Sequence, residues 1–276
     1  MEFRVGEDTL FYEIEGSGHP VVFLHSMGTD HRSMKSWMEP VLDESSGVQR
    51  IYVDIPAHGR SNCHSVRSTQ DIVNLFVRFV DEVIPDGRFS LAGHSFGGYL
   101  AQGVFSARVE RAAGICLIAP VLHLRERTLP EKVVKIKDEA CLREVDADIR
   151  QAFETLMVYQ TRENLETFFN EVQPGRALLD RSFIASNWRE DGYFLREDPL
   201  GDGVYEHPAL FIAGKLDAIT GFEDCSFLTN KFSNSTFAVL EDAGHLMTIE
   251  KRAEVQSLVK DWAMKCMSAT GMKVQL

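Results

Sequence analysis

Three residues in this chain have the types and the chain order of a nucleophile, an acid and a base. Ser95 lies in the segment Gly93-His94-Ser95-Phe96-Gly97, and Asp217 and His245 each follow a later apolar run. A serine hydroxyl is a weak nucleophile until a base removes its proton. A histidine can take that proton, and an aspartate can hold the imidazole in the required tautomer and stabilise the imidazolium. The three residues together predict nucleophilic catalysis at Ser95.

The serine lies on a turn between a predicted strand and a predicted helix. The pattern G-x-S-x-G follows an apolar run over 89–92 and precedes a helical segment over 99–107. Glycine is needed on both sides because a Cβ there would collide with the neighbouring strand and helix. The turn places the backbone N–H of Phe96 beside the serine oxygen, where it can donate to a developing oxyanion. Taken alone, the pentapeptide also fits a glycine-rich turn with an incidental serine.

The elements that must position these residues alternate between strand and helix, which predicts a mostly parallel, doubly wound sheet. Core strands are expected over 20–25, 51–54, 89–93, 115–119, 209–213 and 236–240. Helices are expected over 71–84 and 253–264, and an antiparallel hairpin at the sheet edge over 3–5 and 9–14. Because parallel strands end at one edge of a sheet, Ser95, Asp217 and His245 are expected to meet there.

The alternation breaks between Pro120 and about His207. Helices are predicted over 131–145, 147–159, 164–172 and 176–188, with no strand among them. Such a segment is too long and too regular in pattern to be a loop. The predicted organisation is an α/β core over 1–120 and 207–276 with an inserted α-helical cap over 121–206, lying on the carboxyl edge of the sheet.

Composition restricts the classes of partner. The 276 residues carry a formal net charge of −12, which argues against binding to a phosphate backbone and so against nucleic acid. No apolar run approaches the roughly 20 residues of a membrane span, and the N-terminus has no secretory pattern. The expected partner is a small-molecule substrate, and the expected setting is soluble and cytoplasmic; the oligomeric state stays open. The cysteines are expected to be reduced because they are five, scattered, and without C-x-x-C spacing: Cys63, Cys116, Cys141, Cys225 and Cys266.

The sequence predicts neither a metal nor a cofactor. The candidate metal-ligating histidines are spread over loops and include no H-E-x-x-H pattern: His25, His31, His58 and His64. No G-x-G-x-x-G follows a strand, and no Walker A motif is present. Three other carboxylates could replace Asp217 as the acid, but their position relative to the strand ends is poorer: Asp224, Glu241 and Asp242.

On these residues the chain resembles the α/β-hydrolase superfamily, in particular its helical-capped serine branch of esterases, lactonases, C–C hydrolases and proline iminopeptidases. The resemblance covers nearly the whole chain outside the cap. It includes Leu24-His25-Ser26-Met27-Gly28 at the place of the family's oxyanion loop, and Asp54-Ile55-Pro56-Ala57-His58-Gly59-Arg60-Ser61 at the place of its D-x-P-G-x-G-x-S turn. The match implies that the N–H of Met27 joins that of Phe96 in an oxyanion hole, and that His25 is structural and hydrogen-bonded within its loop.

Two residues depart from the family pattern, since Ser26 and Ala57 each replace a glycine that is favoured there for backbone reasons. The Ser26 hydroxyl could contact a substrate, or it could satisfy local backbone groups, as serine often does in turns. His25 and His94 are the other candidate substrate contacts.

The leading hypothesis is a cofactor-independent serine hydrolase that cleaves a small carboxylic ester or lactone through an acyl-enzyme. Dehalogenases and epoxide hydrolases of this fold carry an aspartate where this chain has Ser95, so the resemblance counts against those reactions. Two alternatives remain. One is hydrolysis of a carbon-carbon bond in a β-diketone-like substrate by the same triad, and the other is a ligand receptor that turns over slowly or not at all.

Overall fold

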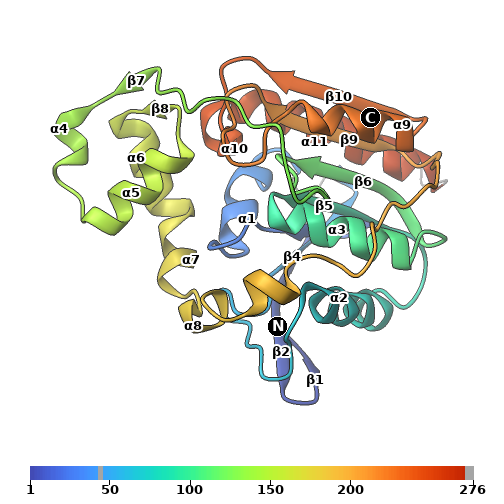
Figure 1. Cartoon of the computed structure of the whole chain (residues 1–276). Helices are drawn as coiled ribbons and strands as arrows, with labels where there is room; N and C mark the ends of the chain where they lie inside the picture. The colour runs from blue at the N-terminus through green and yellow to red at the C-terminus, as the bar shows by residue number, and fades with distance from the viewer. Residues whose placement is uncertain (43–45, 271–276) are drawn as a thin grey trace.

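An eight-stranded sheet in the order β1-β2-β4-β3-β5-β6-β9-β10 forms the centre of the molecule (Figure 1). The computed structural model describes residues 1–42 and 46–270. The strands are β1 (Glu2–Val5), β2 (Asp8–Glu15), β3 (His19–Leu24), β4 (Val48–Val53), β5 (Phe89–His94), β6 (Ala112–Ile118), β9 (Ala209–Gly214) and β10 (Ser235–Leu240). The six strands from β4 to β10 pair in parallel, while β1 and β2 pair antiparallel at one edge. The predicted mostly parallel sheet with an edge hairpin is confirmed.

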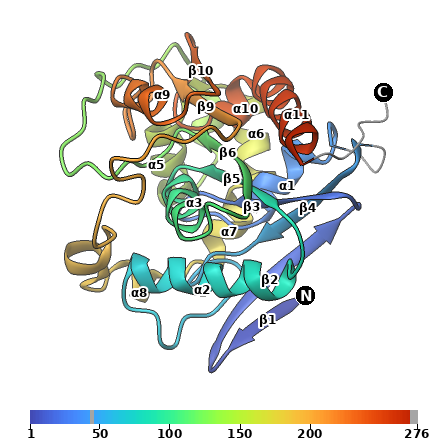
Figure 2. The ribbon, with the colours of Figure 1, turned by 90° about the vertical axis from the view of Figure 1, so that its right-hand side faces the viewer.

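Helices cover both faces of this sheet, as Figure 2 shows in a view turned by 90°. The helices are α1 (Arg32–Met38), α2 (Thr69–Val83), α3 (Phe96–Ala107), α9 (Leu228–Lys231), α10 (Met247–Glu250) and α11 (Arg252–Ala269). Side chains alternate along β3: Val22 and Leu24 join the cluster with α2 and α3, whereas Val21 and Phe23 join the cluster with α1 and α11. The alternating directions of buried strand residues therefore produce a doubly wound fold with two cores.

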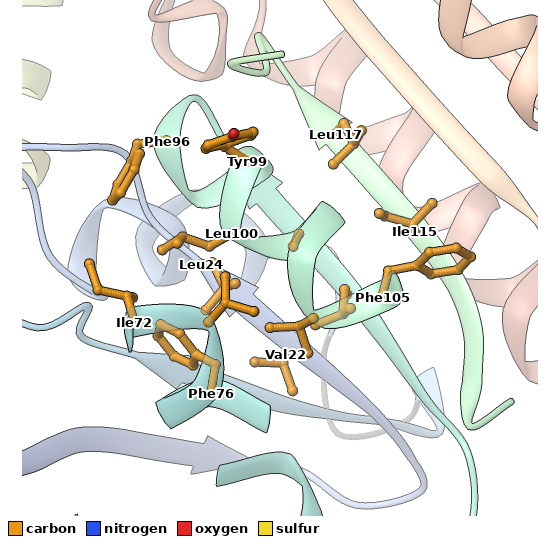
Figure 3. Close-up of a cluster of buried hydrophobic side chains, with 14 of the residues drawn as sticks. Val22, Leu24, Ile72, Phe76, Phe96, Tyr99, Leu100, Phe105, Ile115 and Leu117 are labelled. Carbon is orange, nitrogen blue, oxygen red and sulfur yellow. The ribbon is translucent and has the colours of Figure 1, made fainter. Parts of the chain in front are cut away.

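The larger core lies between the sheet and helices α2 and α3. Phe76 of α2 and Leu100 of α3 meet Val22 of β3 there, as Figure 3 shows. Helix α2 begins two residues before its predicted start because Ser68 caps it. The Ser68 hydroxyl accepts from the N–H of Asp71, and the Asp71 carboxylate accepts from the N–H of Ser68.

The chain between β6 and β9, residues 119–208, is called the insertion below. It contains β7 (Ile136–Lys137), α4 (Glu139–Leu142), α5 (Ala147–Leu156), β8 (Tyr159–Gln160), α6 (Arg162–Glu171), α7 (Gln173–Ala177), α8 (Arg181–Ile184) and a π-helical turn η2 (Trp188–Gly192). The segments from β7 to α7 project to one side of the sheet in Figure 1. Phe153 and Phe168 form the centre of its own small core, which Leu246 and Ile249 complete from the chain after β10.

Three of the helices predicted in the insertion differ in extent from the observed ones, and the predicted absence of strands is wrong. Only 139–142 is helical within the predicted helix over 131–145, because Asp138 caps a helix that starts at that point. The predicted helix over 176–188 is broken, since α7 ends at Ala177 and Asp180 caps a new short helix. The predicted helix over 147–159 ends at Leu156, and Tyr159 instead pairs in parallel with Ile136. Local caps that the apolar pattern does not show set these boundaries.

None of the described helices combines the length and apolar character that a membrane crossing needs.

Helix α3 packs closely against the ends of two strands through glycine. A Cβ on Gly97 would lie 2.3 Å from the carbonyl oxygen of Leu24 and 2.4 Å from that of His25. A Cβ on Gly93 would lie 2.3 Å from the carbonyl oxygen of Gly97. These backbone atoms cannot move without shifting β3 or α3, so the two glycines set how near the helix approaches the sheet.

We expect Gly97→Ala to lower the free energy of unfolding by about 2 kcal/mol or more, because the added methyl group would overlap backbone oxygens. Gly98→Ala in the same helix is the matched control. Its Cβ would meet its nearest atoms at 3.2 Å, and alanine favours the helix, so a loss under about 1 kcal/mol is expected. Urea unfolding of wild type and both variants measures these losses of unfolding free energy. Equal losses would contradict the close approach at Gly97.

Candidate active site

Ser95 sits in a backbone conformation that non-glycine residues rarely adopt, with φ 55° and ψ −116° between β5 and α3. Its N–H donates to the carbonyl of Ile118 at 2.9 Å. Its own carbonyl accepts from the N–H groups of Tyr99 and Val121 at 3.2 and 3.1 Å. Hydrogen bonds from the helix and from the chain beside β6 therefore hold the strained residue in place.

Ser95, His245 and Asp217 form a continuous chain of hydrogen bonds. The Ser95 Oγ lies 3.0 Å from Nε2 of His245, and Nδ1 of His245 lies 2.9 Å from Oδ2 of Asp217. The three side chains follow β5, β10 and β9, whose carboxyl ends lie at one edge of the sheet. An ionised Asp217 accepts from Nδ1–H, which leaves Nε2 free to accept the serine proton. The arrangement can activate a hydroxyl.

Asp217 is held as a carboxylate inside the protein. It is fully buried, and burial opposes its ionisation. The charge of His245 and hydrogen bonds from His245, Thr220 and Ile219 outweigh that penalty and lower the pKa of Asp217 to about 2. The Thr220 hydroxyl donates at 2.6 Å, and the N–H groups of Ile219 and Thr220 donate at 2.8 and 3.1 Å. Asp217 therefore presents a fixed negative charge to the imidazole.

Two side chains hold the loop that carries His245. Nε2–H of His94 donates to the carbonyl of His245 at 3.0 Å. Burial and the nearby charge of His245 lower the pKa of His94 to about 3, so His94 is neutral and acts as a donor through one nitrogen. Glu250 accepts from the N–H of Gly244 at 2.7 Å, on the other side of His245.

Glu250 also joins this loop to the insertion. Its second oxygen accepts from the N–H groups of Val158 and Tyr159 at 2.6 and 2.9 Å. Burial raises the pKa of Glu250, and its three backbone hydrogen bonds oppose that rise. One carboxylate thus fixes β8 of the insertion relative to the residue before His245.

The loop after β3 is held by His25. Nδ1 of His25 lies 2.8 Å from the carbonyl oxygen of Ser26, and Nε2 lies 2.9 Å from the N–H of Ile55, so Nδ1 donates and Nε2 accepts. In the described part of the chain, neither the N–H of Met27 nor that of Phe96 has an acceptor. Both residues line the cavity that holds Ser95.

A cavity of about 670 Å³ opens above Ser95 and His245, between the core and the insertion. Of the three residues considered as substrate contacts, Ser26 lines it, whereas His25 and His94 do not. His25 is fully buried and His94 points to the His245 carbonyl. The Ser26 hydroxyl lies 3.3 Å from that of Thr29, which also lines the cavity.

The two residues that replace a glycine of the family pattern, Ala57 and Ser26, differ in backbone conformation. Ala57 has φ 68°, in the left-handed region that glycine favours, and its carbonyl accepts from the N–H of Asp180 in the insertion at 2.9 Å. Ser26 is not among the described residues with positive φ, so a serine there carries no such strain.

The other carboxylates considered as the acid are engaged elsewhere. Asp224 accepts from the N–H of Thr128, Glu241 pairs with Lys215 at 2.8 Å, and Asp242 lies 3.5 Å from Lys135.

Within residues 1–42 and 46–270, one group of side chains could offer metal ligands, namely Asp30, His31 and Asp54. Asp54 accepts from His31 and from the N–H of Arg60, and Asp30 pairs with Arg32. These hydrogen bonds and the ion pair are sufficient to explain why the three side chains lie together in the core.

Sequence reasoning missed Thr220 and Glu250. Thr220 stands three residues after Asp217, a spacing at which a carboxylate commonly accepts from the following turn, and this signal could have indicated it. Glu250 bonds to residues about 90 positions away, and nothing local in the sequence marks it.

Comparison with known proteins indicates the same family as the sequence motifs do. A family model described as "Alpha/beta hydrolase family" matches residues 21–256. The chain is similar to an (E)-2-((N-methylformamido)methylene)succinate hydrolase from Acinetobacter baylyi, with 23% identity over 92% of this chain and 94% of that protein.

Solved structures show the same fold. An alpha/beta superfamily hydrolase from Oenococcus oeni PSU-1 superposes with a TM-score of 0.83 at 23% identity, covering 96% of this chain and 99% of the other. A thermophilic esterase from Thermogutta terrifontis superposes with a TM-score of 0.67 at 20% identity, covering 95% of each chain.

We expect Asp217→Asn to change how stability depends on pH. The pKa of Asp217 is about 2 in the folded protein and 3.8 ordinarily, so its charge stabilises the fold by about 2 kcal/mol above pH 4. That contribution is lost as pH falls from 4 towards 2. The difference in unfolding free energy between wild type and variant should therefore shrink by about 2 kcal/mol between pH 5 and pH 2. A difference that stays constant would contradict the low pKa.

We expect Glu250→Gln to cost about 1–3 kcal/mol of unfolding free energy, because the amide has one acceptor oxygen for three buried N–H groups. Amide hydrogen exchange at Gly244 and Val158 should also become faster. Glu241→Gln is the control: its carboxylate is exposed in an ion pair with Lys215, and a change under about 0.5 kcal/mol is expected. Unchanged exchange at both amides would show that Glu250 does not join the two segments.

Proposed function

Because the chain belongs to the alpha/beta hydrolase family, we propose that it is a serine hydrolase that cleaves a small carboxylic ester or lactone. The observation that carries the proposal is the hydrogen-bonded chain from Ser95 through His245 to Asp217, which lies at the cavity beside two unengaged backbone N–H groups. Hydrolysis of an acyl bond needs these components: a nucleophile with its base, and donors for an oxyanion. The fold shared with a solved esterase supports the choice of reaction class.

The first half of the reaction forms an acyl-enzyme. Ser95 Oγ attacks the carbonyl carbon while Nε2 of His245 takes the hydroxyl proton. The negative charge that develops on the carbonyl oxygen is stabilised by the N–H groups of Met27 and Phe96. Asp217 stabilises the imidazolium throughout. The tetrahedral intermediate collapses, the C–O bond to the leaving group breaks, and His245 returns the proton to the departing alkoxide.

The second half uses water in place of serine. Nε2 of His245 takes a proton from a water molecule, whose oxygen attacks the acyl carbon and forms a second tetrahedral intermediate. Its collapse breaks the bond to Ser95 Oγ, which recovers its proton from His245, and the carboxylic acid leaves. Besides the ester and this water molecule, the cycle as proposed uses only side chains and backbone N–H groups of this chain.

Hydrolysis of a carbon-carbon bond by the same triad is the alternative that one observation favours. Ser26 lines the cavity next to Met27, and a hydroxyl at this position would suit a second oxygen of a β-diketone-like substrate. A panel of short esters, acyl-homoserine lactones and dienone acids distinguishes the two reactions. A ligand that stabilises the protein but is never consumed would favour the receptor alternative instead.

Replacement of Ser95 tests the nucleophile. We expect Ser95→Ala to lower kcat/KM for short p-nitrophenyl esters by at least about 10⁴-fold and to abolish labelling by a fluorophosphonate probe. Ser106→Ala, at an exposed position of α3, is the matched control and should keep both activities. Labelling that persists in the Ser95 variant would show that another residue is the nucleophile.

A further inference from the structure

The cavity above Ser95 is cationic although the protein is acidic. Its charged lining residues apart from His245 are four arginines, Arg125, Arg127, Arg176 and Arg189, and one carboxylate, Asp148. Asp148 is already paired with Arg176 at 3.0 Å. In a chain of net charge −12, this leaves a local excess of positive charge beside the nucleophile. A cleft lined by one sign of charge concentrates ligands of the other sign.

Arg127 and Arg189 reach the cavity from different segments and are anchored by weak partners. Nη1 of Arg127 donates to the carbonyl of Ile219 at 3.3 Å, two residues after Asp217. Nη2 of Arg189 contacts Sδ of Met27 at 3.5 Å. Across the described residues, no carboxylate lies within ion-pair distance of either guanidinium. Each has five N–H donors, so most of them stay available to a ligand.

Tyr193 lines the same cavity as the two arginines and packs against Phe96. Its ring stacks on that of Phe96 at 5.7 Å between centroids, and it lines the cavity. Its hydroxyl has no hydrogen-bond partner in the part of the chain that the structure describes. Burial raises the pKa of Tyr193, while the charges of Arg127 and Arg189 both act to lower it. The phenol remains protonated and can donate.

We propose, on the basis of the proposed hydrolase function, that the substrate carries a free carboxylate on its acyl part, bound by Arg127, Arg189 and the hydroxyl of Tyr193. A guanidinium presents paired donors that match a carboxylate. Arg189 touches Met27 and Tyr193 stacks on Phe96, so these two side chains lie on the side of the cavity where the acyl oxygen would be held, and Arg127 reaches the same cavity from beside Ile219. Apolar residues elsewhere in the lining, such as Leu156 and Ile184, suit a short hydrocarbon chain between the two ends.

A pair of esters that differ in one charge tests the proposal. The probes are mono-p-nitrophenyl adipate, which ends in a carboxylate, and its methyl ester, which is neutral. Wild-type kcat/KM should favour the carboxylate about 10- to 100-fold, as charged hydrogen bonds imply. That ratio should fall towards one in Arg127→Gln and in Arg189→Gln, and should decrease with added salt. Arg143→Gln, an exposed arginine of the insertion outside the cavity lining, is the control and should keep the ratio.

The outcomes separate this inference from the proposed function. If wild type is labelled by fluorophosphonate but hydrolyses both esters equally, or prefers the methyl ester, the carboxylate site is wrong and the hydrolase function stands. If neither ester is cleaved and Ser95 is not labelled, the proposed function fails. Calorimetry with adipate itself then tests the carboxylate site independently of hydrolysis. Binding by wild type and Ser95→Ala that is lost in Arg127→Gln and Arg189→Gln supports it, and absence of binding overturns it. Melting temperatures of the variants identify any that fail to fold.

Discussion

The backbone at Ser95 is the constraint on which the rest of this molecule depends. A residue with φ 55° is stable only where its surroundings hold it, and here the carbonyl of Ile118 and the N–H groups of Tyr99 and Val121 do so. The same turn requires α3 to lie against the ends of β3 and β5, which only glycine at positions 93 and 97 allows. The strained backbone of Ser95 and the close packing of α3 against the sheet thus depend on the same turn.

The other two members of the hydrogen-bonded chain are placed by loops rather than by helices or strands. Asp217 is buried as a charge, which is costly unless several donors satisfy it, and Thr220, Ile219 and His245 supply them. His245 is positioned through its backbone, by His94 on its carbonyl and by Glu250 on the preceding N–H. The loops can hold precise side-chain positions because buried polar groups fix them.

The insertion also contacts the loops that surround Ser95. Glu250 links β8 to the loop of His245, and Leu246 completes the insertion's small core. The backbone N–H of Asp180 donates to the carbonyl of Ala57, whose φ is positive. The insertion also brings Arg189 and Tyr193 against residues beside Ser95. The cavity is consequently lined by Ser95 and His245 at the sheet edge and by cationic and aromatic groups of the insertion.

The sequence alone was sufficient to predict the sheet, its edge hairpin, and the three residues that the structure brings into one hydrogen-bonded chain. The reason is that apolar strands, a glycine-bracketed serine and strand-end residues are local patterns, and parallel strands necessarily end together. Only the tertiary structure determined the helices of the insertion, the roles of Glu250 and His94, and the cluster of Arg127, Arg189 and Tyr193. Short helices there start at caps such as Asp138 and Asp180, which compete with the apolar pattern. Glu250 and the arginines act through contacts across 90 or more positions of the chain, and such contacts leave no periodic signal in sequence because they depend on how separate segments pack.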